Sequence, residues 1–227
     1  MNINASKRVF IIKPPIASYV PRRYTPTTRG SASMTLIDEF SIETAITALK
    51  KKIPNLNKKK AYMLVNSGGG SLSSAYKIAS VIRDAFKDIT VFIPHYALSG
   101  GTLLALTGNR IRMGMMSQLS ALDVQVPYES STVSVNSLLR ARKKLNDAFE
   151  TKTVDDLPYP YRHLVESLDP IIIEEWTGIQ EEITHYLKEI LEKTGYAKEQ
   201  IDKLVETMVF GLPTHGFVIR YQHAKEL

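Results

Sequence analysis

The chain has 227 residues, of which 44% are hydrophobic and 23% charged, a balance typical of a soluble globular protein. It contains no cysteine, which excludes disulfides, thiolate catalysis and cysteine-ligated metals. The net charge of +6 comes largely from clusters such as Lys50–Lys52 and Lys58–Lys60. No aromatic residues interleave these clusters, so we interpret them as solvated helix ends and loops and do not expect nucleic-acid binding.

No segment has the roughly eighteen uninterrupted apolar residues that a membrane-spanning helix requires. We therefore expect no integral membrane segment and a cytoplasmic protein. The histidines show no metal-ligand spacing, and we expect neither a metal nor another cofactor.

The predicted elements begin after an irregular arm. Residues 1–33 are rich in Pro, Arg, Thr and Ser, and we place the arm at 1–28 and a single domain at 29–227. Helical spacing of apolar residues predicts a helix over 41–53 with Ser41 as its N-cap. Short apolar runs predict strands, and the next helical patterns lie between them. The predicted strands are 61–65, 89–94 and 111–116, and the predicted helices between them are 72–86 and a helix opening at 102–106.

Strands and helices that alternate at this spacing indicate a parallel sheet with right-handed crossovers. After Val126 the pattern changes, and long amphipathic helices are predicted over 133–149, 171–194 and 198–208. We therefore expect an α/β domain whose portion from about residue 133 is helical.

The candidate reactive site consists of two glycine-rich turns that are one strand–helix crossover apart. The first is Asn66–Ser71, with the sequence Asn-Ser-Gly-Gly-Gly-Ser, and it follows a predicted strand and opens a helix. Such a turn exposes backbone N–H groups that bind negative charge. A phosphate-binding loop would need Gly-Lys-Ser/Thr, and a dinucleotide site would need a glycine where Ser73 stands, so neither nucleotide site is favoured. A carboxylate or an oxyanion fits the turn, and by itself the motif is also compatible with a tight turn that binds nothing.

The second turn is Tyr96–Thr102, with the sequence Tyr-Ala-Leu-Ser-Gly-Gly-Thr. Here Ser99 stands between a strand and a helix, as a nucleophile does at a strand-to-helix elbow. Alone, such a turn is also typical of an ordinary helix cap. Because both turns follow parallel strands, they are expected at the same edge of the sheet, where they place a serine hydroxyl beside exposed amides.

These motifs, together with Arg112–Gln125, resemble the Clp protease/crotonase superfamily, and within it the serine dehydrogenase proteinase family, related to signal peptide peptidase A. Gly30–Met34 and Pro213–Ile219 add further similarity, so the resemblance spans roughly residues 29–227. It implies a spiral of ββα units, a serine nucleophile, a protein or peptide substrate and a homo-oligomer. It also implies Ser99 as the nucleophile, with Gly69, Gly70 and Gly100 at the oxyanion-hole positions.

The general base departs from the family pattern. Asp123 stands where Clp proteases have a histidine, and Gln180 and Glu181 stand where a lysine is expected in signal-peptide-type peptidases. A base must come within hydrogen-bond reach of Ser99. We take Asp123 and Lys144 as the candidates for the catalytic set. The remaining residues considered for this role are Lys143, Lys152, His95, His163 and His215.

Several functions fit this sequence. The leading hypothesis is an ATP-independent serine peptidase or amide hydrolase that uses Ser99. The alternative is a catalytically inactive oligomeric scaffold on the same fold, which the unassigned base favours. A crotonase-type acyl-thioester enzyme, using the oxyanion hole without Ser99, is a third hypothesis, and binding of nucleic acid through the lysine clusters is the fourth.

Overall fold

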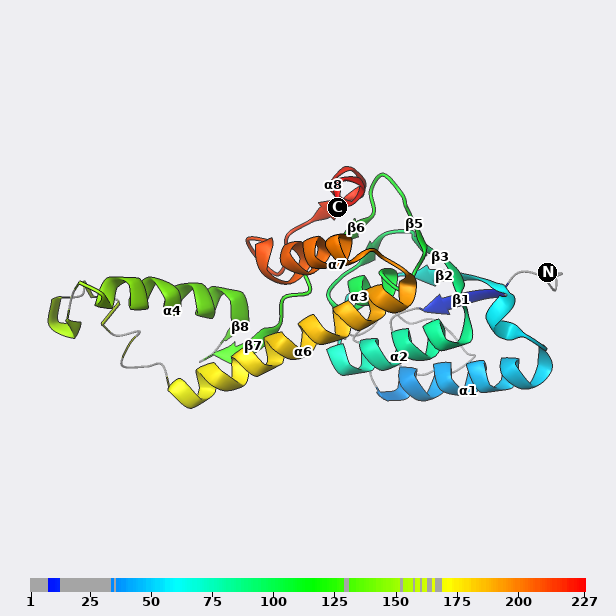
Figure 1. The fold of residues 1–227 in the computed structure, drawn as a ribbon, viewed down its shortest axis with the longest axis horizontal. Coiled ribbons are helices and arrows are strands. Elements are labelled where there is room, and N and C mark those ends of the chain that lie inside the picture. The colour runs from blue at the N-terminus through cyan, green and yellow to red at the C-terminus, as the bar shows by residue number, and fades with distance from the viewer. Residues whose placement is uncertain are drawn as a thin grey trace, which may run out of the picture.

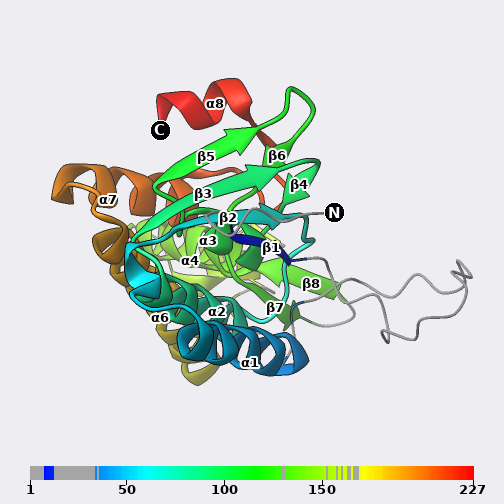
Figure 2. The same ribbon diagram turned by 90° about the vertical axis from the view of Figure 1, so that its right-hand side faces the viewer.

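The structure is a computed structural model that describes residues 8–12, 34, 36–128, 131–151, 153–156, 158–159, 161–162, 165 and 169–227. Its centre is a four-stranded parallel sheet in the order β1-β2-β3-β5 (Figures 1 and 2). The strands are β1 (Arg8–Ile12), β2 (Lys60–Val65), β3 (Asp88–Ile93) and β5 (Arg110–Met113). The register pairs Ala61 of β2 with Ile89 of β3.

Three long helices lie side by side along one side of this sheet: α1 (Leu36–Lys52), α2 (Leu72–Ala85) and α6 (Pro170–Thr194) (Figure 2). The apolar stripe of α2 is fully buried at Ala75, Ile78, Ala79 and Ile82. The Ser71 side chain caps this helix by accepting a hydrogen bond from the Ser74 N–H at 3.3 Å. The short helix α3 (Gly100–Ala105) packs against α2 and is buried throughout.

Smaller elements complete the fold. A three-stranded sheet contains β4 (Tyr96–Ala97), β6 (Gln118–Leu119) and β9 (Ile219–Arg220), and β7 (Gln125–Tyr128) forms a hairpin with β8 (Ser131–Ser134). The remaining α-helices are α4 (Val135–Phe149), α7 (Lys198–Val205) and α8 (Tyr221–Glu226). The 3₁₀ turns are η1 (Leu56–Lys58) and η2 (Val154–Asp156), and a π-helix, η3 (Glu206–Gly211), follows α7.

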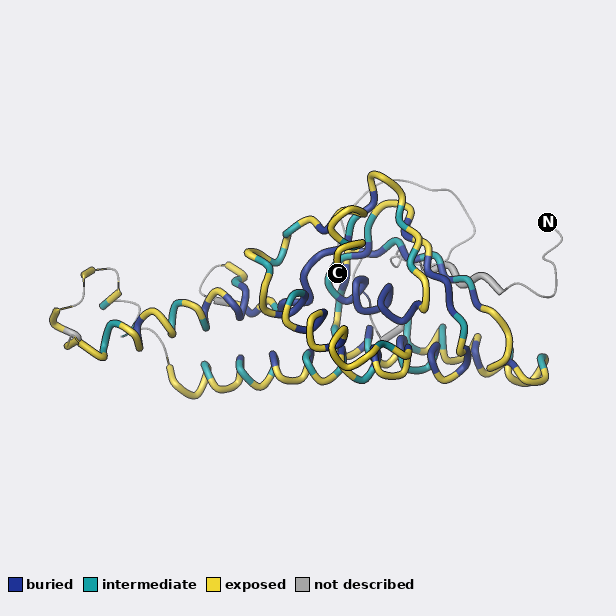
Figure 3. The backbone as a smooth tube through the Cα atoms, turned by 45° about the horizontal axis from the view of Figure 1, so that its top comes forward, coloured by how far each residue is buried: buried dark blue, intermediate teal, exposed yellow. Residues whose placement is uncertain are grey.

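The polypeptide extends away from the main body at α4 and the first half of α6 (Figure 1). This extension has its own small core of Val126, Val135, Leu138 and Trp176. The burial pattern in Figure 3 shows the deep core under the central sheet and mostly exposed or half-buried backbone along the extension. None of the described helices is long and apolar enough to cross a membrane.

The predicted elements are present, with corrections at their ends: the strand predicted over 111–116 ends at Met113, and the helix predicted to open at 102–106 begins at Gly100. Helix α1 begins at Leu36 instead of Ser41, so Ser41 is not its N-cap; Asp38 and Glu39 supply the acidic first turn that a helix N-terminus favours. The predicted helix over 133–149 begins at Val135, since residues 133–134 belong to β8 and Ser134 is the N-cap. The predicted helix over 198–208 ends at Val205 and continues as the π-helix. Apart from β1, the predicted arm lies outside the described residues.

Candidate active site

Ser99 occupies a sharp turn between β4 and α3. Its backbone has φ 50° and ψ −122°, a conformation that non-glycine residues rarely adopt and that costs about 1–3 kcal/mol. Backbone strain of this kind persists only where the surroundings hold it in place. Here the Ser99 N–H donates to the Ser120 hydroxyl at 2.8 Å, and the Gly101 N–H donates to the Leu98 carbonyl at 2.7 Å.

The Thr102 side chain hydrogen-bonds this turn to β4, the strand that precedes it. Its hydroxyl donates to the Ala97 carbonyl at 2.8 Å and also lies 3.1 Å from the Ser120 carbonyl. Neither Thr102 nor Ser120 was identified from the sequence as part of the site. Both hydroxyls are buried, and a buried side chain seldom shows a local sequence signal because its partners lie on other elements.

The first glycine turn lies against the elbow. The Ser67 N–H donates to the Tyr96 carbonyl at 3.0 Å, and the Leu98 N–H donates to the Ser67 carbonyl at 2.9 Å. Gly69 has φ 105°, and a Cβ added there would lie 2.9 Å from the Cβ of Ser99. The absence of a side chain at Gly69 is therefore what lets Ser99 stand over this turn, as the sequence predicts for paired turns at one sheet edge.

A bridge to Met34 fixes the other side of the turn. The Met34 N–H donates to the Gly69 carbonyl at 2.8 Å, and the Ser71 N–H donates to the Met34 carbonyl at 3.2 Å. Gly70 lies between these bonds with φ 139°, and an added Cβ would lie 2.1 Å from the Met34 nitrogen. Only glycine fits at this position.

The three glycine amides predicted for the oxyanion hole differ in their availability. The Gly69 N–H already donates to the Ser67 hydroxyl at 3.2 Å. The N–H groups of Gly70 and Gly100 donate to no acceptor within the part of the chain that the structure describes. Two of the three predicted amides thus lack an acceptor among the described residues, and Gly70 is the one of these two that lines the cavity described next, while the third supports the turn.

A cavity of about 510 Å³ opens beside both turns. Ser99, Gly70 and Asp123 line it, so the structure brings these three predicted residues together, with Gly69 and Gly100 as their direct chain neighbours. The other lining residues are Gly68, Ser71, Leu72, Ser73, Val124, Gln125, Ile179, Glu182, Ile183, Tyr186 and His215.

Asp123 is almost fully buried at 4% exposure, and one of its carboxylate oxygens has no hydrogen-bond partner among the described residues. Burial raises the pKa of this carboxyl above its ordinary value, because the charged form loses hydration. Hydrogen bonds from the Ser134 side chain and the Asn136 backbone act in the opposite direction, as do the charges of His215 and Arg140. The result is a carboxylate inside the cavity that binds a proton more readily than an exposed one.

His215 contacts this aspartate through the main chain. Its Nδ1 lies 2.6 Å from the Asp123 carbonyl oxygen, so Nδ1 carries the proton and donates. The carbonyl thereby orients the imidazole at the cavity wall.

The structure does not bring Lys144 to the cavity. Lys143 and Lys144 are exposed on α4, because the helical period turns Leu138 and Leu145 toward the protein instead. His95 is also exposed, and Lys152 and His163 lie outside the described residues.

Gln180, at the position where a lysine was expected, is buried and has a structural partner. Its side-chain amide donates to the Asn136 side-chain carbonyl, and the Asn136 amide donates to the Val209 carbonyl. These bonds join α6, α4 and the π-helix. Gln180 therefore holds the extension in place and does not face Ser99.

The wall of the cavity opposite the glycine turns comes from α6 and is largely apolar. Ile179, Ile183 and Tyr186 line it, and the Tyr186 ring stacks on Tyr76 at a centroid distance of 4.0 Å. The Tyr186 hydroxyl donates to Glu182, and this hydrogen bond raises the pKa of Tyr186 to about 12. Among the described residues no group of three or more His, Asp or Glu side chains could hold a metal ion.

A strained serine, a buried carboxylate and the unbonded amide of Gly70 lie around one cavity, and a serine hydrolase uses groups of these kinds. The sequence model of the ClpP-like SDH-type serine proteinases matches residues 34–227, and the chain belongs to that family. The predicted family and its α/β fold are thereby confirmed.

Two relatives from Methanocaldococcus jannaschii share sequence with the chain. The uncharacterized protein MJ1495 is 23% identical over 165 residues, which are 73% of this chain and 49% of that protein. The uncharacterized protein MJ0137 is 26% identical over 194 residues, 86% of this chain and 59% of that protein. The chain thus spans about half to three fifths of the length of these relatives.

Two solved structures of the membrane-bound stomatin-specific protease 1510-N have a similar fold. One is a serine-to-alanine mutant, with a TM-score of 0.54 and 12% identity over 97% of this chain and 75% of that one. The other is a lysine-to-alanine mutant in complex with a substrate peptide, with a TM-score of 0.53 and 14% identity over 98% of this chain and 73% of that one. At this level of identity the likeness shows the shared fold.

Proposed function

We propose that the protein is a serine peptidase with Ser99 as its nucleophile. The observation that carries this proposal is the backbone of Ser99, which is held at φ 50° by neighbouring hydrogen bonds while its side chain lines a cavity. Strain that the surroundings maintain at a cavity-lining serine is expected where the serine reacts. Membership of a serine proteinase family supports the same conclusion.

The amides of Gly70 and Gly100 form the proposed oxyanion hole. Both N–H groups lack an acceptor among the described residues; Gly70 lines the cavity with Ser99, and Gly100 directly follows Ser99 in the chain. When the Ser99 Oγ adds to a peptide carbonyl, the carbonyl oxygen becomes negative and these donors stabilise it. Gly69 contributes by leaving room for Ser99, since its own N–H is bound to Ser67.

Asp123 is the proposed proton acceptor. It lines the same cavity as Ser99, whereas Lys144 is exposed on α4 and no lysine belongs to the described lining. In this scheme the carboxylate takes the Ser99 hydroxyl proton as the Oγ–carbon bond forms. It then passes that proton to the leaving amine as the peptide C–N bond breaks. Water hydrolyses the acyl-enzyme with Asp123 acting as base again.

Peptides with apolar side chains are the proposed substrates. Ile179, Ile183 and Leu72 give the cavity an apolar wall, and the complex of 1510-N with a substrate peptide shows that this fold accommodates a peptide. Burial of one apolar side chain against such a wall contributes about 1.5–3 kcal/mol of binding.

We further propose a homo-oligomer, as the family resemblance implies. The extension exposes Ile171 at 72% and Tyr159 at 77%, and a neighbouring copy would cover such side chains. Light scattering of the purified protein tests this, and a monomeric mass would contradict it. Cytoplasmic localisation stays a prediction.

A fluorophosphonate probe tests the nucleophile directly. We expect a covalent adduct that peptide mapping by mass spectrometry places on Ser99, absent in Ser99→Ala and slowed in Asp123→Asn. Ser73→Ala is a matched control, because this serine lines the same cavity and has no proposed part in the reaction. A well-folded protein without any adduct would contradict the peptidase and favour the inactive scaffold.

A further inference from the structure

A second cavity, of about 400 Å³, lies at the opposite end of the central strands from Ser99. Its lining comes from the segments that precede β2, β3 and β5 and from the last turns of α2 and α6. The lining residues are Asn57, Arg83, Asp84, Lys87, Asn109, Lys193 and Thr194. All of them are polar, and three cations face one carboxylate.

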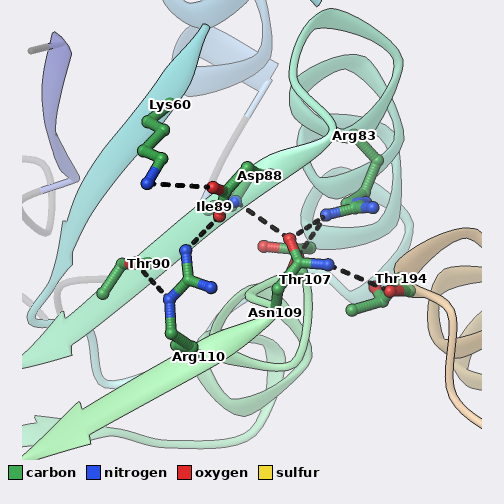
Figure 4. A network of polar contacts seen from close by, with 9 residues as sticks. All are labelled: Lys60, Arg83, Asp88, Ile89, Thr90, Thr107, Asn109, Arg110 and Thr194. Carbon is green, nitrogen blue, oxygen red and sulfur yellow. Dashed lines mark hydrogen bonds and ion pairs between the residues drawn. The ribbon is translucent and has the colours of Figure 1, made fainter. Parts of the chain in front are cut away.

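Arg83 is the buried member of this set, at 7% exposure. Its Nη1 donates to the Thr107 carbonyl at 3.1 Å and to the Asn109 side-chain carbonyl at 3.0 Å (Figure 4). Its Nη2 donates to the Lys193 carbonyl at 2.7 Å. All three acceptors are neutral oxygens. The Nε of Arg83 is buried without a hydrogen-bond partner among the described residues.

The Arg83 guanidinium thus forms no salt bridge with the residues that the structure describes. No carboxylate of the described residues lies within 4.0 Å of its guanidinium. Asp88 lies nearby, but its carboxylate is bound to Arg110 and lies 3.8 Å from the Lys60 ammonium (Figure 4). Burial lowers the pKa of Arg83 because the cation loses hydration, and the charge of Asp88 acts in the opposite direction. An uncompensated buried charge is costly, so an anion in the adjoining cavity would stabilise the fold.

The surroundings of the cavity are also basic. Lys87 is exposed at its rim, and Lys193 pairs there with Glu189 at 2.8 Å and with Asp84 at 3.7 Å. Exposed lysines at the end of α1 and around η1 surround the same end of the sheet: Lys50, Lys51, Lys52, Lys58, Lys59 and Lys60. Clustered charges of one sign raise the local concentration of ions of the opposite sign.

We propose that this cavity binds a small phosphate-bearing anion, held by the Arg83 guanidinium and the Lys87 ammonium. Arg83, Lys87 and Lys193 outnumber Asp84 and the Glu189 that pairs with Lys193, which leaves a local excess of positive charge that favours an anion. A phosphate also offers three or four acceptor oxygens, enough for several converging donors. The site is separate from the proposed peptidase site and does not depend on that function.

Calorimetric titration of the whole protein tests the proposal, at fixed ionic strength with chloride as the background anion. The probes are inorganic phosphate, glycerol 3-phosphate and adenosine monophosphate, which distinguish free phosphate from a phosphate ester. We expect saturable binding of at least one probe. Lys87→Gln should bind it about ten-fold more weakly, the loss expected for one charge-assisted hydrogen bond. Lys59→Gln is the matched control, since Lys59 is equally exposed at this end but outside the cavity lining.

An NMR titration of the native protein tests the role of Arg83 even if every substitution of Arg83 unfolds the protein. In ¹⁵N-arginine-labelled protein, the Arg83 Nε–H resonance should move on phosphate addition in proportion to occupancy. The Arg83 resonance is assigned by its absence from the spectrum of Arg83→Lys, recorded at a temperature where that variant is folded. If the variant does not fold, through-bond experiments on the native protein give the assignment. Three results would overturn the proposal: no saturable binding of any probe, equal weakening by Lys59→Gln and Lys87→Gln, or binding without movement of the Arg83 resonance.

Discussion

The backbone N–H of Ser99 donates to the hydroxyl of Ser120 at 2.8 Å, across a sequence separation of 21 residues. This bond joins the strained elbow to the residue that directly follows β6, and the Thr102 hydroxyl strengthens the same junction. The geometry of the proposed nucleophile is thus set by a neighbouring strand as well as by its own turn. A prediction follows for each part of this arrangement.

Ser120→Ala should lower turnover more than it lowers stability. The change removes the acceptor for the Ser99 N–H, which costs about 1 kcal/mol of stability. It also allows the elbow to relax, and a small displacement of a nucleophile lowers kcat strongly. Peptide hydrolysis and thermal unfolding measured on the same preparation check this. Unchanged kcat would show that the turn holds Ser99 without Ser120.

Ser99→Gly and Ser99→Ala should both be inactive but should differ in stability. Glycine adopts φ 50° and ψ −122° without strain, whereas alanine retains the strain of the native serine. We expect Ser99→Gly to unfold at a temperature about 2–4 °C above Ser99→Ala, corresponding to roughly 1 kcal/mol in a chain of this size. Equal melting temperatures would mean that the elbow carries no strain.

Gly70→Ala should unfold the first glycine turn. The added Cβ would meet the Met34 backbone nitrogen at 2.1 Å, and φ 139° is unsuitable for alanine, so we expect a loss of more than about 3 kcal/mol. Gly178→Ala is the matched control. It adds the same methyl group where no atom lies within 4 Å, inside α6, and should stabilise by up to about 1 kcal/mol. Urea denaturation measures both changes, and a mild effect at Gly70 would contradict the described bridge.

Asp123→Asn should abolish hydrolysis and raise stability above the folded-state pKa of Asp123. Burial raises the pKa of the Asp123 carboxyl in the folded protein. The contribution of this carboxyl to the free energy of unfolding is therefore fully present below its unfolded pKa, about 3.9, and is lost as pH rises through its folded pKa. At neutral pH the native protein therefore carries a buried charge that the variant lacks. Melting temperatures across pH 3–8 should converge at the acidic end. A variant less stable than the native protein at pH 8 would refute the assignment.

Ile179→Glu should raise KM for peptides with apolar side chains by about ten-fold, because it places a charge in the apolar wall of the cavity. Ile179 is only half-buried, so the fold should tolerate the change. Ile172→Glu makes the same substitution on the same helix at a site 42% exposed and outside the cavity lining. We expect no effect from this control. Similar KM changes in the two variants would place the substrate elsewhere.

The parts of the site that could be predicted from sequence are those fixed by local backbone geometry. Glycines that permit positive φ, and a serine before two glycines, favour a turn through their own backbone preferences, so the sequence predicts both turns, and the structure places Ser99 beside Gly69. Asp123 was found through its offset from Ser99 in the family pattern. Lys144 was chosen by residue type alone, and the direction of its side chain depends on which face of α4 packs inward.

Arg83 illustrates what local patterns miss. In the sequence it lies near the end of a helix, where an arginine is ordinarily solvated. Its burial results from carbonyl groups of Thr107 and Lys193, which are 24 and 110 residues away along the chain. The Asn136–Gln180 bond, 44 residues apart, escaped notice for the same reason. Such contacts exist only once the elements have packed.

Helix α6 supplies residues to both cavities: Ile183 and Tyr186 to the first, Lys193 and Thr194 to the second. At 1.5 Å per residue, the eleven positions from Ile183 to Thr194 span about 16 Å. A small phosphate held by Arg83 therefore cannot touch a peptide bound at Ser99, so an influence of one ligand on the other would pass through displacement of the helices that line both cavities, α6 and α2. Because α6 is continuous over both stretches, its displacement would move the apolar wall of the first cavity as a rigid unit. Such a movement would change the preference among substrates more than the rate of the chemical step at Ser99.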